Sequence, residues 1–266
     1  MSTDSSLTSV KVRADGACGT ILLSGKARRN ALSASTLEDL RQAFADLHQQ
    51  KSVRAVMLTG DGDCFCAGTD LLEIESAQQE ESPHLAWFAD VASLRELLVT
   101  MMQFPKPILA AVNGPALGSG LGLVAACDLV LAAPEARFAM PEAQHGLTAG
   151  PSIPLLAFRL GASRAAQLVL GAQTWTAEQA AQAGLVHEIS SFEFLWARGR
   201  QWADQIAQGS ASALAMNKRL LNETVGEQLS TQISATVASL AATRTTDDAR
   251  IGVRAFLAKT PPAWEA

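Results

Sequence analysis

The sequence predicts an α/β fold in which the first 150 residues build the sheet and the remainder is mainly helical. Up to Gly150, short apolar runs alternate with amphipathic helical patterns, which is typical of a sheet covered by helices. The run Ile108–Val112 is apolar at every position, as in a parallel strand buried on both faces. Beyond Gly150, Ala-rich helical patterns dominate, and residues 185–189 are the only strand candidate.

Local signals place the elements along the chain. Asp15-Gly16 is a hairpin signal between the first two strands. Ser35, followed by Glu38 three residues later, fits a capping box that opens a helix. Residues 73–82 are polar and are expected to be mobile. The expected strands cover residues 7–13, 19–23, 53–58, 108–112, 127–132 and 185–189, and the expected helices cover 83–103, 118–126, 155–160, 162–170, 177–183, 193–208, 211–222, 228–242 and 246–258.

Composition restricts the classes of function. The chain has 266 residues, of which 48% are hydrophobic, and its formal charge of −5 offers no basic surface for nucleic-acid phosphates. No stretch reaches the roughly 20 apolar residues of a membrane span. The first residues lack an apolar signal core, so a cytoplasmic protein is expected. There is no tyrosine, and the four histidines and four cysteines lack metal-ligand spacing, so no metal site is expected.

Two glycine-containing segments could stabilise negative charge. Residues 65–71, Phe-Cys-Ala-Gly-Thr-Asp-Leu, follow a strand and a turn, and their small residues leave backbone N–H groups open to a developing oxyanion. Residues 113–122 lead from a strand into glycines that open a helix, so free N–H groups and the positive helix end converge there. The second segment also fits a loose dinucleotide fingerprint, but the acidic residue is misplaced and no second half follows.

A third segment, residues 138–147, holds the only obvious acid–base candidates. Glu142 lies among apolar residues just after a strand, where desolvation would raise its pKa toward that of a general base working near neutral pH. His145 stands three residues later and could share a helical face with it. Either side chain could instead have a structural role, Glu142 at a helix N-terminus and His145 in packing.

Together these segments resemble the crotonase (enoyl-CoA hydratase/isomerase) superfamily, and the resemblance extends over about residues 7–264. Each motif is modest alone, but the five occur in register at spacings similar to those of the family. The segments that carry the resemblance are residues 28–32, 63–71, 113–120 with Cys127-Asp128, 138–146 and 255–259.

The resemblance implies a fold, a substrate class and an assembly. It implies a spiral of ββα units with the active site over residues 1–195, and a C-terminal helical region for packing and oligomerisation over 196–266. Such regions make trimers, often paired into hexamers. The implied substrate is an acyl-CoA thioester, so coenzyme A belongs to the substrate and no separate cofactor is expected. No nucleic acid or membrane is expected as a partner.

The resemblance also assigns roles to individual residues. By position, the backbone N–H groups of Thr69 and Ser119 would hold the thioester oxyanion, and Glu142 would move the proton. Ser119 stands where the family usually has glycine, which is tolerable because the backbone N–H acts, although the side chain would narrow the pocket. Further substrate contacts are expected from Arg28, Ala67, Gly68, Asp70, Leu71, Gly118, His145 and Lys259.

The binding site for the nucleotide part of coenzyme A departs from the pattern of the relatives. Asp61 and Asp63 stand where relatives commonly carry a basic residue. The phosphates would therefore meet Arg28, Arg29 and a Lys259 from a neighbouring subunit, although each of these could equally be a solvated surface charge.

The acid pattern favours isomerase chemistry over hydration. Typical hydratases of the family carry two glutamates, and the first of them falls at Gly122 here. Gly150 stands where other branches carry a catalytic aspartate. One glutamate can shift a double bond by removing and returning a proton. The alternatives that remain open are hydration by one acid, thioester hydrolysis, decarboxylation and a catalytically silent acyl-CoA binding subunit.

Overall fold

The computed structural model describes residues 8–79, 81–226 and 228–264. Its main layer is a six-stranded sheet in the order β1-β2-β3-β4-β6-β9. β1 and β2 are antiparallel and the other neighbours are parallel. These strands are β1 Val10–Asp15, β2 Cys18–Leu23, β3 Ala55–Gly60, β4 Ile108–Val112, β6 Leu129–Ala132 and β9 Glu188–Ile189.

A second, smaller sheet holds the strands that sequence patterns missed. Its order is β5-β7-β8, with β5 Ala116–Leu117, β7 Arg137–Ala139 and β8 Trp175–Thr176. Strands of two or three residues are too short to show the alternation on which sequence prediction depends. β8 also corrects the expectation that residues 185–189 hold the only strand after Gly150.

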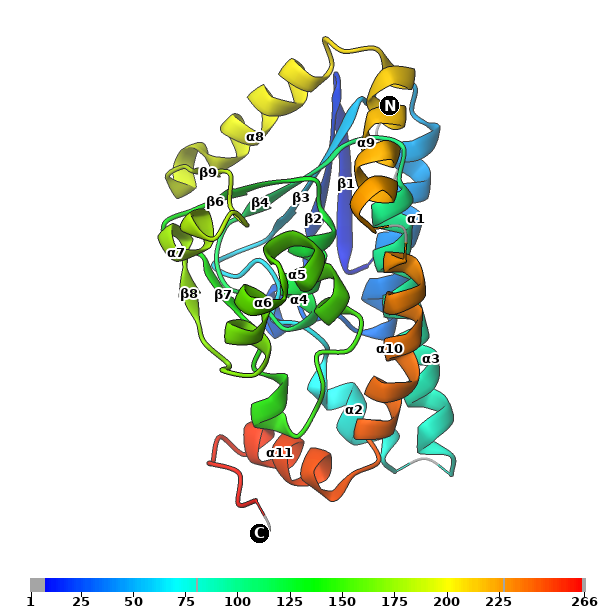
Figure 1. Cartoon of the computed structure of the whole chain (residues 1–266), viewed down its shortest axis with the longest axis vertical. Helices are drawn as coiled ribbons and strands as arrows, with labels where there is room; N and C mark the ends of the chain where they lie inside the picture. Colours follow the sequence, from blue (N-terminus) through cyan, green and yellow to red (C-terminus); the bar gives the residue numbers. More distant parts are fainter. Residues whose placement is uncertain (1–7, 80, 227, 265–266) are drawn as a thin grey trace.

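Helices cover both faces of the main sheet (Figure 1). They are α1 Ala34–Gln49, α2 Leu71–Ala77, α3 Pro83–Gln103, α4 Ser119–Ala126, α5 Ser152–Leu160, α6 Ala162–Val169, α7 Ala177–Gln182, α8 Phe192–Ile206, α9 Ala211–Gly226, α10 Leu229–Thr243 and α11 Asp247–Leu257, with 3₁₀ turns η1 Lys26–Arg28 and η2 Glu142–His145. None of these described helices combines the length and the apolar character needed to cross a bilayer.

Alternate strand residues are buried against different helices, as the two-residue period of a strand requires. In β3, Met57 packs in a cluster with Leu195 and Ala203 of α8. Its neighbours Val56 and Leu58 belong to the larger core on the other face, which includes side chains of α1 and α3. Every residue of β4 is buried, which confirms the strand predicted to be buried on both faces.

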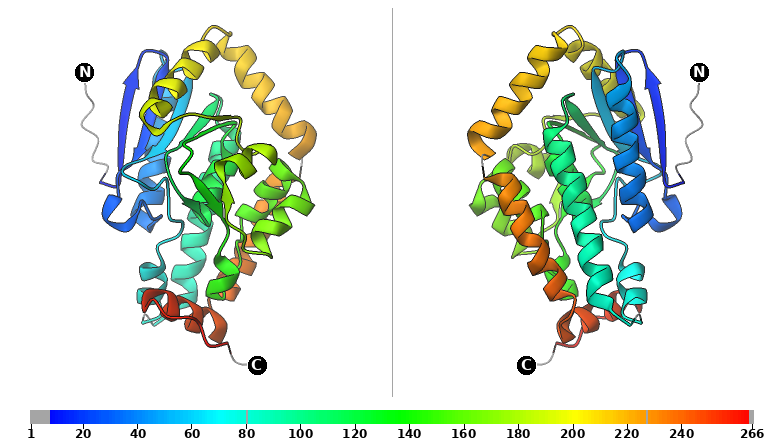
Figure 2. Two further views of the ribbon diagram at one scale, coloured as in Figure 1. Left: turned by 90° about the vertical axis from the view of Figure 1, so that its left-hand side faces the viewer. Right: turned by 90° about the vertical axis from the view of Figure 1, so that its right-hand side faces the viewer.

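The C-terminal helices return to the body of the protein. α10 packs along α3 and against α5, and α11 contacts η2 and α2. Figure 2 shows α9 and α10 descending past the sheet to α11, which lies at the end of the molecule near the C-terminus. The chain therefore carries its last helix back to the segment that contains Glu142.

Three local predictions differ from the structure. Ser33, not Ser35, caps α1, and its side chain accepts a hydrogen bond from the Thr36 N–H at 3.1 Å. The polar segment that begins at residue 73 was expected to be mobile, but α2 occupies its first part, with Ile74 and Ala77 buried. The division predicted between residues 195 and 196 falls inside α8 and stays a prediction.

Candidate active site

All the site residues predicted from sequence line one cavity of about 630 Å³. It collects segments from η1, the 67–71 loop, the start of α4, η2 and the ends of α10 and α11. A larger cavity between α3, α9 and α10 contains none of the predicted site residues. The predicted residues brought together here are Arg28, Ala67, Gly68, Thr69, Asp70, Leu71, Gly118, Ser119, Glu142, His145 and Lys259.

Backbone pairing holds the loop that carries Thr69. The Leu32 N–H donates to the Gly68 carbonyl at 2.8 Å, and the Asp70 N–H donates to the Leu32 carbonyl at 3.0 Å. This pairing uses the groups on either side of Thr69. Within the described part of the chain, the Thr69 N–H donates to no backbone carbonyl, so it is available to a ligand.

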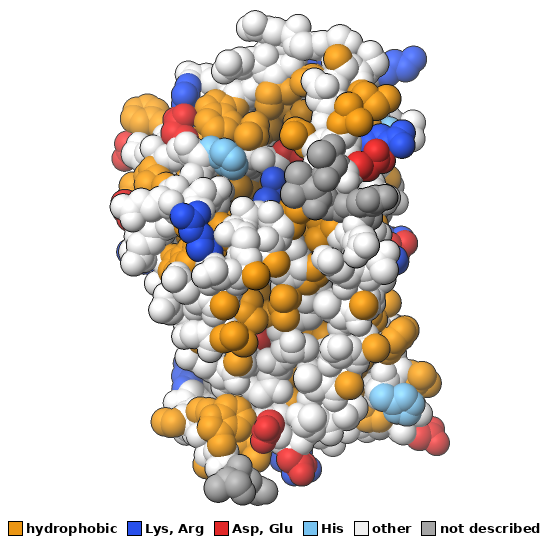
Figure 3. Space-filling model, in the orientation of Figure 1, with side chains coloured by type: hydrophobic (Ala, Val, Ile, Leu, Met, Phe, Trp, Pro, Cys, Tyr) orange, Lys and Arg blue, Asp and Glu red, His pale blue; other side chains and the backbone are white. Residues whose placement is uncertain are grey.

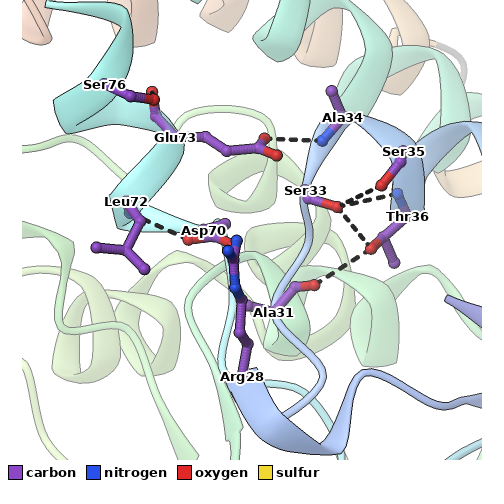
Figure 4. Close-up of polar contacts among 10 residues, drawn as sticks. All are labelled: Arg28, Ala31, Ser33, Ala34, Ser35, Thr36, Asp70, Leu72, Glu73 and Ser76. Atoms are coloured by element: carbon purple, nitrogen blue, oxygen red, sulfur yellow. Dashed lines mark hydrogen bonds and ion pairs between the residues drawn. The ribbon is translucent and has the colours of Figure 1, made fainter.

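Side chains fix the same loop from the other side (Figure 4). Asp70 caps α2 by accepting from the Leu72 N–H at 3.0 Å, and its other oxygen pairs with Arg28 at 2.5 Å. Glu73 accepts from the Ala34 N–H at 2.9 Å. The Asp70 carboxylate is 5% exposed and fully engaged, so it positions the loop.

Glycines allow the two N–H donors to approach each other. Gly68 has φ +91°, and a Cβ there would lie 2.7 Å from the Leu117 carbonyl oxygen and 3.3 Å from the Ser119 nitrogen. Ser119 is the first residue of α4, where a backbone N–H has no partner within the helix. The positive end of the helix dipole therefore adds to the Ser119 N–H at this point.

The side chains of the two predicted donors also touch. Thr69 Oγ1 and Ser119 Oγ lie 2.9 Å apart and form a hydrogen bond. Ser119 is buried at 6% exposure, so its hydroxyl sits inside the wall of the cavity. The Ser119 hydroxyl thus links the 67–71 loop to the start of α4.

Glu142 lies directly against this site. Burial raises the pKa of Glu142 to about 7. A Cβ on Gly118 would lie 2.4 Å from Glu142 Oε1, so the carboxylate packs on a glycine backbone next to Ser119. Among described atoms its Oε2 is buried without a hydrogen-bond partner. A carboxyl with a pKa near 7 can both accept and return a proton at neutral pH.

A side chain at position 122 would meet Ser152. A Cβ on Gly122 would lie 2.3 Å from Ser152 Oγ. Ser152 is fully buried, and its hydroxyl has no partner in the described chain. Gly150 has φ +48°, and a Cβ there would lie 2.6 Å from a methyl of Leu240. Sequence reasoning missed Ser152, because nothing in the linear pattern connects it to Gly122.

His145 packs against the last helix. Its ring meets Phe256 edge to face with centroids 4.8 Å apart, and its backbone lies against Gly252. Burial lowers the pKa of His145. These contacts favour the packing role over a second proton shuttle, although the side chain also lines the cavity.

The cavity also has walls that the sequence motifs did not indicate. Leu240 and Arg244 line it at the end of α10, and Phe256 and Leu257 line it from α11. Lys259 of the same chain also lines it, and the contribution of a Lys259 from a neighbouring subunit stays a prediction. Helix ends distant in sequence carry no local signal for such a role.

Metal-ligand clusters and cysteine thiols are two further kinds of reactive group. No group of three or more His, Cys, Asp or Glu side chains in the described residues could hold a metal ion. Burial raises the pKa of both Cys66 and Cys127 to about 12, so these thiols stay protonated and are poor nucleophiles. Two backbone N–H groups and one buried carboxyl on the wall of the same cavity are groups suited to moving a proton next to a carbonyl group.

Comparison with known proteins agrees with this class. The sequence profile of the family described as "Enoyl-CoA hydratase/isomerase" matches residues 14–266. A Mycobacterium bovis protein named "Probable enoyl-CoA hydratase echA6" is 38% identical over 77% of this chain and 78% of its own. The mevalonyl-coenzyme A hydratase of Aspergillus fumigatus is 31% identical over 89% and 87%.

Solved structures give the same result. The crystal structure of an enoyl-CoA hydratase from Mycobacterium avium is 28% identical, with a TM-score of 0.85 over 98% of this chain and 100% of that one. The chain therefore belongs to the enoyl-CoA hydratase/isomerase family, which is the crotonase superfamily that its motifs resemble. It is an acyl-CoA enzyme of that family.

Proposed function

We propose that this enzyme shifts the double bond of an enoyl-CoA, with Glu142 as its single proton carrier. The observation that carries the proposal is a single buried carboxyl, Glu142, whose pKa is raised to about 7, together with a glycine at position 122, where a Cβ would lie 2.3 Å from Ser152 Oγ. A base beside two N–H donors suffices for isomerisation. Hydration in addition requires a water molecule to be held and activated.

The reaction proceeds in two proton transfers. The thioester oxygen of a 3-enoyl-CoA accepts hydrogen bonds from the Thr69 and Ser119 N–H groups. The Glu142 carboxylate removes a proton from C2, and the electron pair spreads over the thioester oxygen and C4 as a dienolate. Neutral Glu142 then returns the proton to C4, which gives the 2-enoyl-CoA and restores the carboxylate. The N–H donors stabilise the charge where it develops.

Hydration by a single acid is the second candidate. The names of relatives favour it, since the proteins from Mycobacterium avium and Aspergillus fumigatus are both called hydratases. In that reaction Glu142 would have to position water and also deliver a proton. A side chain that carried a second carboxylate at position 122 would bring its Cβ to 2.3 Å from Ser152 Oγ.

The remaining binding roles follow from the same cavity. Arg28, Arg29 and Lys259 lie on its wall and would meet the phosphates of coenzyme A. α9 exposes Met216, Leu220 and Leu221, each at least half exposed. Figure 3 shows further apolar side chains on the face of the molecule that is turned to the viewer in Figure 1. Such exposed apolar faces support assembly into a homotrimer or a pair of trimers.

The substitution Glu142→Gln tests the mechanism. It keeps the shape of the side chain and removes the proton carrier, so turnover of 3-enoyl-CoA should fall by about 10²–10⁴-fold, while acyl-CoA binding persists. Rates of 3-enoyl-CoA isomerisation and crotonyl-CoA hydration are measured side by side, with the exposed Glu135→Gln as a matched control.

Each outcome of these two assays has a distinct meaning. Near-normal isomerisation by Glu142→Gln would show that Glu142 is not the base. Hydration without any double-bond shift in the unaltered enzyme would replace the isomerase proposal with the hydratase one. Tight acyl-CoA binding with no turnover of either ester would indicate a silent binding subunit.

A further inference from the structure

One buried asparagine next to the active-site cavity has no part in the proposed reaction. Its two neighbours in the chain line the cavity, whereas Asn30 itself is only 1% exposed. Asn30 Nδ2 donates to the carbonyl oxygens of Cys64 at 2.7 Å, Asp61 at 3.0 Å and Phe65 at 3.3 Å. The two N–H bonds of one amide thus serve three carbonyl groups of residues 61–66, the loop that follows β3.

Two features of Asn30 are costly. Arg29 and Asn30 are consecutive residues with positive φ, 52° and 57°, in a region that side chains other than glycine adopt rarely. Asn30 Oδ1 is buried and accepts no hydrogen bond from the described residues. Strained backbone and unpaired buried groups persist where the surrounding structure over-determines them, and they cluster at functional sites. These costs favour a functional role for the Asn30 amide.

The loop that Asn30 holds is bonded to the segment that carries one oxyanion donor. The Cys66 N–H donates to the Pro115 carbonyl at 3.1 Å, and the Cys66 carbonyl accepts from the Leu117 N–H at 2.9 Å. These bonds tie the end of the loop to β5. Ser119 follows only two residues after Leu117, so the position of the loop sets the position of the Ser119 N–H.

The same loop continues into the segment that carries the other donor. The Ala67 N–H donates to the carbonyl of Arg29, the residue before Asn30, at 3.0 Å. Leu32, two residues after Asn30, forms a parallel bridge with Thr69. The neighbours of Thr69 make the hydrogen bonds of this bridge, which leaves the Thr69 N–H free. Asn30 therefore lies between the two contacts that hold the Thr69 segment.

Taking the oxyanion role proposed above for the Thr69 and Ser119 N–H groups as its basis, we infer that Asn30 is a positioning residue that fixes where these two groups point. Donors of this kind act at about 2.7–3.1 Å from the oxyanion. A misplacement of about 1 Å can cost about 10²-fold in rate. Asn30 acts through the backbone of loop 61–66, to which both donor segments are bonded.

The substitution Asn30→Gly tests the role of the amide. Glycine adopts a positive φ without strain, so the change removes the amide without blocking the backbone conformation. Asn113 continues to hold the loop, because its Oδ1 accepts from the Gly60 N–H at 3.1 Å and its Nδ2 donates to the Gly62 carbonyl at 2.9 Å. The variant should therefore fold, and kcat for isomerisation should fall by about 10²-fold with KM little changed.

A bound β-ketoacyl ester reports on the two donors without turnover. Acetoacetyl-CoA loses a proton from C2 to form an enolate, which absorbs in the near ultraviolet and carries its charge on oxygen. Titration of the enzyme-bound ester gives the pH at which half of it is enolate. A loss of about 10²-fold in enolate stabilisation in Asn30→Gly raises that pH by about 2 units. A loss of folding stability alone does not produce this shift.

Two further variants make the result specific to the Asn30 amide. Asn30→Asp keeps the shape and tolerates the positive φ. Its carboxyl faces three carbonyl oxygens, so it is expected to stay neutral and keep one O–H donor, and its enolate should form at an intermediate pH. Lys106→Met is the matched control, because Lys106 Nζ also donates to three backbone carbonyls, at the end of α1. It should leave enolate formation unchanged, whatever its effect on Tm.

The outcomes separate this role from the enoyl-CoA proposal. Unchanged enolate formation in both Asn30 variants, or a loss that Lys106→Met reproduces, would overturn the positioning role. Asn30→Asp alone decides the question if Asn30→Gly does not fold. Binding of acetoacetyl-CoA without an enolate on the unaltered enzyme would instead remove the oxyanion site on which this role depends.

Discussion

Positions 142 and 122, the two from which an acid could serve this active site, differ in what occupies them. At the first, Glu142 packs its carboxylate against the backbone of Gly118, and burial raises its pKa to about 7. At the second, Gly122 has no side chain, and Ser152 Oγ fills the space that a Cβ would enter. The difference teaches that α5 packs closely on α4 at Gly122, because its first residue, Ser152, lies where a side chain at position 122 would begin.

The largest effect is expected from removing the Ser119 N–H, one of the two proposed oxyanion donors. Ser119 is the first residue of α4, a position at which proline is tolerated. Ser119→Pro removes the N–H donor, so kcat should fall by about 10²–10³-fold. Ser119→Ala keeps the N–H and loses only the hydroxyl bond to Thr69, so it serves as the control in the same isomerase assay. Equal losses in both variants would contradict the role of the N–H.

A second acid can be introduced at position 122. Gly122→Glu must displace Ser152 Oγ, and overpacking of this kind costs about 1–3 kcal/mol. For a chain of this size each kcal/mol lowers Tm by about 2–4 °C. Adding Ser152→Ala should restore part of the stability in a thermal melt and raise crotonyl-CoA hydration above that of the unaltered enzyme.

Gly25→Glu is a suitable comparison for that experiment, because a Cβ there meets its nearest atom at an ordinary 3.7 Å. An unchanged Tm for Gly122→Glu would show that Ser152 does not close the position. Restored stability without any gain in hydration would show that a second carboxylate at this point cannot activate water.

The raised pKa of Glu142 predicts that both the rate and the stability of the enzyme depend on pH. Proton removal needs ionised Glu142, so kcat/KM for isomerisation should rise as pH increases through about 7. Stability should change in the opposite direction. The folded-state pKa of Glu142 is raised above the ordinary glutamate value of 4.5, so the folded state binds the extra proton between about 4.5 and 7 and loses that advantage as pH rises through 7.

Melting temperatures and rates across this range check both trends, and Glu142→Gln should flatten the contribution of this group to each. A rate profile that rises instead near pH 4.5 would show that Glu142 is not desolvated in the working enzyme.

The sequence by itself determined the α/β order of the chain and the core of its site. The apolar run of β4 and the pattern of α3, which begins at Pro83 as expected, depend on local periodicity and so are visible in the linear sequence. The motifs around Thr69, Ser119 and Glu142 were visible for the same reason. Each is a short segment, and the roles proposed for its residues depend on their own backbone or position.

Only the tertiary structure decided what surrounds these residues. The contact of Ser152 with Gly122, the hydroxyl bond between Thr69 and Ser119, and the place of Arg244 on the cavity wall join segments that lie far apart in the chain. Such contacts arise from how helices pack on the sheet. Their energetics depend on burial and distance, and no local pattern encodes either quantity.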